Sequence, residues 1–159
     1  MIIGVENISG IFSIFHDGSI IHYASNGSDL ELDVEILYLA ERVNTNYQTF
    51  HLTLRNVRDL VFKAWSKDFS AEPDLRLSLT QIFDPELGIL SSSSAGDVIE
   101  VVCDIYSQTC DCNGGSLLFK ADSAVVTDEG DKEYSIEELC QLCDGYWSDW
   151  EKKNANRQQ

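Results

Sequence analysis

The chain has 159 residues, which is enough for one domain with a real core and too few to favour two. Its 27 acidic and 11 basic side chains give a formal net charge of -16. This charge argues against nucleic acid or an anionic membrane as a partner, because phosphate groups attract the opposite sign. It suits a basic protein partner.

The hydrophobic content of 43% is that of a globular protein, and no apolar run approaches the roughly 20 residues of a membrane helix. Residues 1–15 lack the basic leader and the cleavage pattern of a signal peptide. The five cysteines are an odd number, which favours a reducing compartment over a disulfide framework. A cytoplasmic location is therefore expected.

The chain is predicted to begin with a short edge strand over residues 1–5 and one or two helical turns over residues 7–15. The helical turns are supported by apolar residues at helical spacing, namely Ile8, Ile11, Phe12 and Phe15. A strand is expected over residues 18–24, with residues 25–28 as its turn.

The clearest strand pattern runs from Leu30 to Ile36, where apolar and acidic residues alternate strictly. The same alternation returns at Phe50, Leu52 and Leu54. Turn-forming residues near 43–46 predict that the two segments pair as a hairpin. We place Val34 opposite Leu54, which puts Asp33 opposite Arg55 on the open face.

Further strands are predicted over residues 59–65, 97–106 and 116–127. Residues 75–83 suggest a short helix, although the alternating leucines there also permit a strand. The serine-rich segment at 91–96 is expected to form a turn.

The last predicted element is a helix that begins at a capping box formed by Ser135 and Glu138. Its apolar stripe is expected to dock onto the sheet and comprises Ile136, Leu139, Cys140, Cys143, Tyr146, Trp147 and Trp150. The sequence thus predicts one α+β domain over residues 1–150, with an antiparallel sheet of about six strands and a C-terminal helix packed on one face. Residues 151–159 are expected to form a polar tail.

Two cysteine pairs suggest a four-cysteine zinc site: Cys110 with Cys112, and Cys140 with Cys143. The second pair has the spacing of a zinc ligand pair, whereas the first has only one intervening residue. Cys140 and Cys143 also lie on the apolar stripe, where buried cysteine is common. Packing is the favoured interpretation, so no cofactor is expected and zinc is the alternative.

His16 and Asp17 are candidates for a general base or a metal ligand. The alternative is a turn in which Asp17 caps backbone amides. His22 and His51 lie in separate predicted strands, and they become relevant only if the histidines share a face.

An acidic ladder lies on one strand face and consists of Glu31, Asp33 and Glu35. It is either a solvated face or a docking surface for a basic protein. Four residues of the last helix extend the candidate surface with acids and aromatic anchors: Asp144, Trp147, Asp149 and Trp150. The sequence has no phosphate-cradling glycine loop, no nucleophile elbow and no His-Glu-x-x-His pair.

Part of the sequence resembles small bacterial proteins that are uncharacterised or classed as immunity proteins of polymorphic toxin systems. The resemblance lies in the segments at 14–20, 30–34 and 50–54, and its most specific part is Phe15-His16-Asp17-Gly18. The resemblance covers about the first third of the chain. It implies a non-enzymatic binder that blocks a toxin, and a basic nuclease would suit the charge of -16. Two alternatives stay open: a small enzyme or metal-binding protein that uses His16 and Asp17 or the cysteine pairs, and a small-molecule-binding domain.

Overall fold

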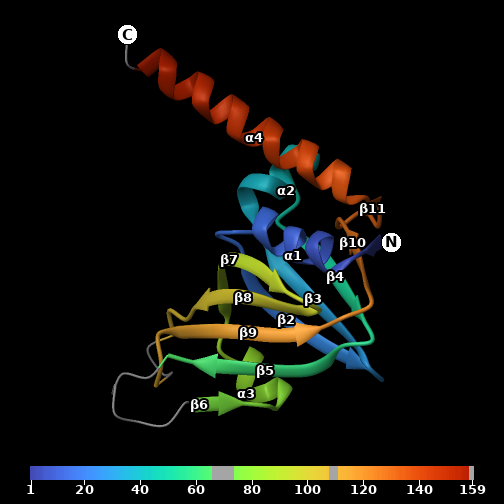
Figure 1. Ribbon diagram of the computed structural model, residues 1–159. Coiled ribbons are helices and arrows are strands. Elements are labelled where there is room, and N and C mark those ends of the chain that lie inside the picture. Colours follow the sequence, from blue (N-terminus) through green and yellow to red (C-terminus); the bar gives the residue numbers. More distant parts are fainter. Residues whose placement is uncertain (66–73, 108–110, 158–159) are drawn as a thin grey trace.

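The computed structural model describes residues 1–65, 74–107 and 111–157, and within them it contains eleven strands and four helices (Figure 1). The helices are α1 (Val5–Ile14), α2 (Leu37–Val43), α3 (Leu79–Phe83) and α4 (Ile136–Arg157). The strands are β1 (Ile2–Ile3), β2 (Ser19–Asn26), β3 (Asp29–Glu35), β4 (Thr49–Arg55), β5 (Arg58–Ala64), β6 (Asp74–Arg76), β7 (Leu87–Ala95), β8 (Val98–Asp104), β9 (Gly114–Lys120), β10 (Ser123–Thr127) and β11 (Glu133–Tyr134). Within these ranges, every helix is too short or too polar to span a lipid bilayer.

The strands form one antiparallel sheet in the order β1-β10-β4-β3-β2-β7-β8-β9-β5-β6, with β11 paired to β10. The predicted α+β class, the antiparallel sheet and the C-terminal helix are confirmed. The prediction of about six strands is wrong, because the sheet has eleven.

Two misread segments account for two of the additional strands. The serine-rich segment belongs to β7, where Leu87 and Ile89 are buried and the serines continue the pairing with β8. The turn follows at Gly96, whose φ of 62° is accessible to glycine at little cost. The predicted strand at 116–127 is two strands, since β9 pairs with β8 and β5 whereas β10 pairs with β4 and β1.

The predicted pairing of the two alternating segments is correct, but its register is wrong by four residues. Val34 lies opposite Phe50, and Asp33 lies opposite His51 rather than Arg55. The helix α2 occupies the connection that was predicted as a turn, and this sets the register. Because four is an even number, the same apolar residues still face the core.

The helix α1 confirms the helical turns predicted over residues 7–15, and it forms the middle layer of the molecule. It packs on β7 and β8 on one side and on α4 on the other. Its Phe12 is fully buried, and the Phe12 ring meets Phe119 edge-on at 5.8 Å between centroids. Phe15 stacks on Phe50 at 5.3 Å, so the end of α1 is anchored to β4.

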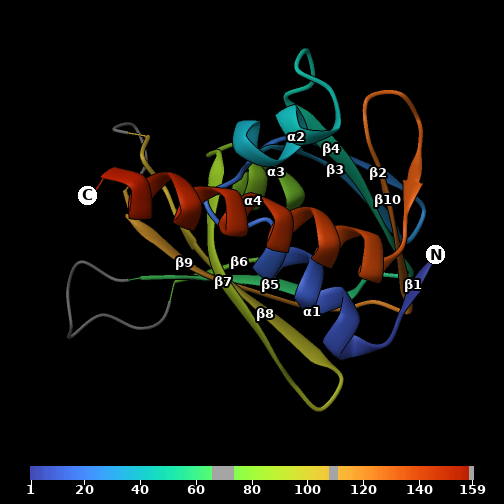
Figure 2. The same cartoon turned by 90° about the horizontal axis from the view of Figure 1, so that it is seen from above.

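The helix α4 begins at the predicted cap, where the backbone amide of Glu138 donates a hydrogen bond to the Ser135 hydroxyl at 3.1 Å. It packs mainly on α1 and α2 (Figure 2), so the prediction that its stripe docks onto the sheet is wrong. Leu139 is its fully buried residue. The helix continues to Arg157, so residues 151–157 of the predicted polar tail are helical, and 158–159 lie outside the described residues.

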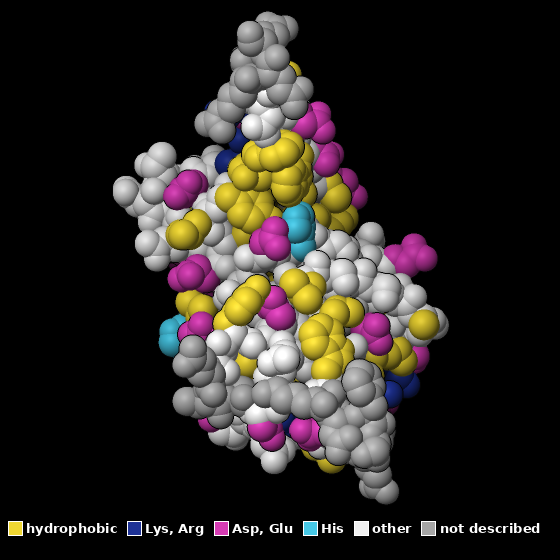
Figure 3. Space-filling model, turned by 90° about the vertical axis from the view of Figure 1, so that its left-hand side faces the viewer, with side chains coloured by type: hydrophobic (Ala, Val, Ile, Leu, Met, Phe, Trp, Pro, Cys, Tyr) yellow, Lys and Arg dark blue, Asp and Glu magenta, His cyan; other side chains and the backbone are white. Residues whose placement is uncertain are grey.

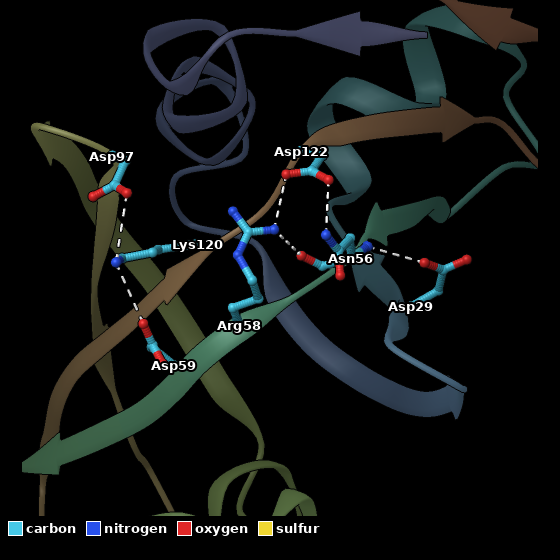
Figure 4. Close-up of polar contacts among 7 residues, drawn as sticks. All are labelled: Asp29, Asn56, Arg58, Asp59, Asp97, Lys120 and Asp122. Carbon is cyan, nitrogen blue, oxygen red and sulfur yellow. Dashed lines mark hydrogen bonds and ion pairs between the residues drawn. The ribbon is translucent and has the colours of Figure 1, made fainter.

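A polar corner holds the sheet together where β4 leads into β5 and β9 into β10 (Figure 4). Asn56, at a φ of 51°, donates its backbone amide to Asp29 at 3.0 Å and its side-chain amide to Asp122 at 2.8 Å. Arg58 donates to Asp122 at 2.8 Å. The Asn56 bonds are the main reason that the pKa values of both carboxyl groups are lowered. These carboxylates therefore stabilise the fold above the ordinary carboxyl pKa, and this contribution is lost as the pH falls through their lowered values.

Lys120 extends the same corner toward the β7–β8 hairpin (Figure 4). Its ammonium group lies 3.4 Å from Asp59 and 3.5 Å from Asp97, and these partners raise its pKa, the hydrogen bond with Asp59 most strongly. The charges of this corner are paired with one another, which indicates a structural role.

Candidate functional site

An aromatic cluster lies where the second half of α4 passes over α2 and the end of α1. We define it as His16, Tyr38, Tyr146, Trp147 and Trp150. The rings of His16 and Trp147 are stacked, with centroids 5.7 Å apart and planes 11° from parallel. Tyr38 lies 4.5 Å from Tyr146, and Trp147 lies 5.8 Å from Trp150.

Helical spacing brings the three α4 aromatics to one side of the helix, since residues one turn apart share a face. The other two members are held in place by hydrogen bonds. The Tyr38 hydroxyl donates to the backbone carbonyl of His16 at 2.8 Å, and His16 Nδ1 donates to the carbonyl of Ser13 at 2.8 Å. Burial is the main cause that raises the pKa of the Tyr38 hydroxyl. These contacts therefore hold the side chains of the cluster in defined positions.

Much of this cluster faces solvent. Trp147 is 36% exposed and Trp150 is 48% exposed. Figure 3 shows a broad apolar patch on this face of the molecule, beside a histidine and an acidic side chain. Single exposed apolar side chains are common on protein surfaces, whereas a contiguous exposed apolar patch marks an interaction surface.

The two flanks of the patch carry opposite charge (Figure 3). Asp144 and Glu151 lie three residues before and four residues after Trp147, so both share its side of α4. Lys152 and Lys153 lie toward α2, where they line a groove.

The groove between α2 and α4 has a volume of about 570 Å³. It is lined by Tyr38, Glu41, Arg42, Thr45, Tyr146, Asp149, Trp150, Lys152 and Lys153. Arg42 donates a hydrogen bond to Asp149 at 2.9 Å, and this bond is the main reason that the pKa of Asp149 is lowered. A Cβ at Gly145 would lie 2.9 Å from the Arg42 guanidinium, so a larger residue there would displace the tip of this side chain.

The predicted partner-binding residues fall into two places. Asp144, Trp147, Asp149 and Trp150 all lie in the middle of α4, although Asp149 is already paired with Arg42. The acidic ladder lies on the outer side of β3, between buried apolar residues. Glu35 ends that strand two positions before the start of α2, and Glu31 lies about 13 Å farther along it.

Two of the three histidines converge. His22 and His51 lie opposite Asp33 from the two strands that flank β3. His51 Nδ1 donates to Asp33 at 2.7 Å, and all three line a hollow of about 100 Å³. His16 is elsewhere, stacked on Trp147, with its Nε2 4.0 Å from the Asp17 carboxylate.

Among the cysteines that the structure describes, no metal centre is formed. Cys112 is buried, Cys140 is exposed and Cys143 is partly buried, while Cys110 lies outside the described residues. Within residues 1–65, 74–107 and 111–157, no group of three metal-ligating side chains could hold an ion. The expected burial of Cys140 on the stripe is wrong, because α4 turns this side chain to solvent.

The cysteine environments predict unequal reactivity. Burial raises the pKa of the Cys103 thiol to about 12, so Cys103 stays protonated and shielded at pH 8. We expect a thiol reagent such as Ellman's reagent to modify Cys140 in the native protein and Cys103 only after unfolding, as peptide mapping would show. Cys140→Ser should change the free energy of unfolding by less than about 0.5 kcal/mol. Rapid native labelling of Cys103 would contradict this arrangement.

Sequence reasoning missed the contribution of α2, which provides Tyr38 and Arg42. The segment was predicted to lead into a turn. The signal was present, since Leu39 and Val43 are four residues apart at helical spacing. Lys152 and Lys153 were missed because they were assigned to a polar tail.

Compared with known proteins, the chain matches no protein-family model, no curated protein and no solved structure.

Proposed function

We propose that this chain is a non-enzymatic protein-binding module whose partner is a basic protein. The observation that carries the proposal is the exposure of Trp147 and Trp150 in a positioned aromatic cluster. Tryptophan and tyrosine dominate the binding energy of protein interfaces, because each buries a large area with few rotatable bonds. Packing of the hydrophobic core does not require Trp147 and Trp150 to be exposed.

Charge supports the choice of a basic partner. The net charge of -16 attracts a cationic protein at long range and raises its association rate. Asp144 and Glu151 beside Trp147 supply acidic groups next to the aromatic anchors. The acidic ladder begins at Glu35, close to the start of α2, and would extend the negative field along β3.

The more specific proposal is an immunity-type inhibitor that acts in the cytoplasm. It rests on the resemblance of residues 14–20, 30–34 and 50–54 to proteins of that type and on the acidic charge. His16, in the most specific part of that resemblance, stacks on Trp147 in the aromatic cluster. Such an inhibitor would cover the substrate-binding surface of a basic toxin and carry out no reaction itself.

Charge reversal of the acidic ladder tests the electrostatic part of the proposal. In a tagged pull-down from the native cell, wild-type protein should retain a basic protein at near-equal stoichiometry and release it at high salt. Glu31→Lys with Asp33→Lys and Glu35→Lys should abolish that capture, because like charges then face the partner. Circular dichroism should show that the variant remains folded.

The control carries the same change in net charge at Glu86, Glu100 and Glu137, away from the ladder and the cluster. It should retain the partner. Capture that survives the ladder reversal would show that the ladder is no docking surface. A wild-type bait that holds no basic partner would overturn the proposed function itself.

A further inference from the structure

We propose that the groove between α2 and α4 binds a small anion that carries a planar aromatic ring. This goes beyond protein binding and needs no protein partner. The volume of about 570 Å³ lies within the range of about 300–1,000 Å³ that is typical of small-molecule sites. The groove combines an aromatic wall with a set of cationic side chains.

The aromatic wall is formed by Tyr38, Tyr146 and Trp150. Tyr38 and Tyr146 contact each other at 4.5 Å between ring centroids, which holds both rings in place. Trp150 leaves 48% of its surface exposed, so a flat ligand ring has a large face to cover. Aromatic rings in contact gain about 0.5–1.5 kcal/mol beyond the area that they bury.

Basic side chains are concentrated in this groove, although the chain as a whole is acidic. Three of the 11 basic side chains line this groove, namely Arg42, Lys152 and Lys153. Glu41 and Asp149 also line it, so the groove retains one net positive charge in a protein of net charge -16. This reversal of sign favours an anionic ligand group.

Lys152 and Lys153 are positioned to interact with the anionic group of such a ligand. Arg42 is paired with Asp149 at 2.9 Å, whereas neither Lys152 nor Lys153 forms an ion pair with any described residue. Both lysines lie close enough to help Arg42 lower the pKa of Asp149, so their positive potential reaches the groove. At physiological salt, charges farther away than about 8 Å are largely screened, so the field inside the groove depends mainly on its own lining, which carries one net positive charge.

Two matched dyes test the two halves of the ligand separately. The probe 8-anilinonaphthalene-1-sulfonate carries the ring system with an anion, and N-phenyl-1-naphthylamine carries the same rings without one. Fluorescence titration of the full chain should show one sulfonate dye bound per chain, about tenfold more tightly than the neutral dye. Trp150→Ala should weaken the binding of both.

The double variant Lys152→Gln with Lys153→Gln should weaken the sulfonate dye about tenfold and leave the neutral dye unchanged. The variant Lys63→Gln with Lys132→Gln makes the same change in net charge elsewhere and should leave both dyes unaffected. Equal affinity for the two dyes, or equal losses in both double variants, would overturn the inference. If the chain captures no basic protein but binds the dyes as expected, the proposed function is contradicted and this inference is supported.

Discussion

Replacing Trp147 and Trp150 together with alanine is expected to abolish capture of the basic partner and to leave the protein folded. Central aromatic residues of an interface contribute about 2 kcal/mol or more each, so the pair should weaken binding by a factor of several hundred or more. Both rings are partly exposed, but Trp147 contacts four other rings, each contact being worth about 0.5–1.5 kcal/mol: His16, Tyr38, Tyr146 and Trp150. The free energy of unfolding should therefore fall by about 2 kcal/mol or more, against the about 5–15 kcal/mol by which such domains are stable.

The measurement is a pull-down of the double variant beside wild-type protein, with urea unfolding of both. Trp65→Ala is the matched control, because Trp65 is 45% exposed and directly follows β5, outside the aromatic cluster. It should retain the partner. If the double variant captures the partner as well as wild type does, the aromatic cluster is not the docking surface.

The second large effect is on stability and concerns Phe12. Phe12→Ala should lower the free energy of unfolding by about 3–5 kcal/mol, because it leaves a cavity between the sheet and α1. Phe12 is fully buried, and its ring meets Phe119 of β9. Since domains of this kind are stable by only about 5–15 kcal/mol, the loss should be evident in urea unfolding at 25 °C.

Phe12→Leu serves as the control for this site, since it keeps an apolar side chain of similar volume and should cost less than about 1.5 kcal/mol. A second control is Trp150→Ala, which removes a larger side chain from the surface. If Phe12→Ala proved no more costly than Trp150→Ala, the placement of α1 as the middle layer would be wrong.

The alternating residues of β3 and β4 show how far sequence reasoning reaches. Leu30, Leu32 and Val34 were predicted to face the core, and all three are buried. The prediction of faces succeeds because a strand side chain alternates sides with every residue. The register failed by four residues because it depends on the length of the connection, and α2 was not recognised there.

The helix α4 shows the same division at the candidate site. Its start at Ser135 and its apolar stripe follow from local hydrogen bonding and helical periodicity, and both were predicted. The elements that the stripe contacts depend on the tertiary structure. The helix packs on α1 and α2, so Leu139 is buried while Trp147, Trp150 and Cys140 are exposed.

The sequence by itself determined the α+β class, the antiparallel pairing, the faces of the central strands and the strong negative charge. These depend on period, local capping and composition, which act over a few residues. The tertiary structure alone decided that His16 stacks on Trp147, that Arg42 meets Asp149 and that lysines gather in one groove of an acidic protein. Those contacts join residues more than a hundred positions apart, and their geometry depends on how the whole chain packs.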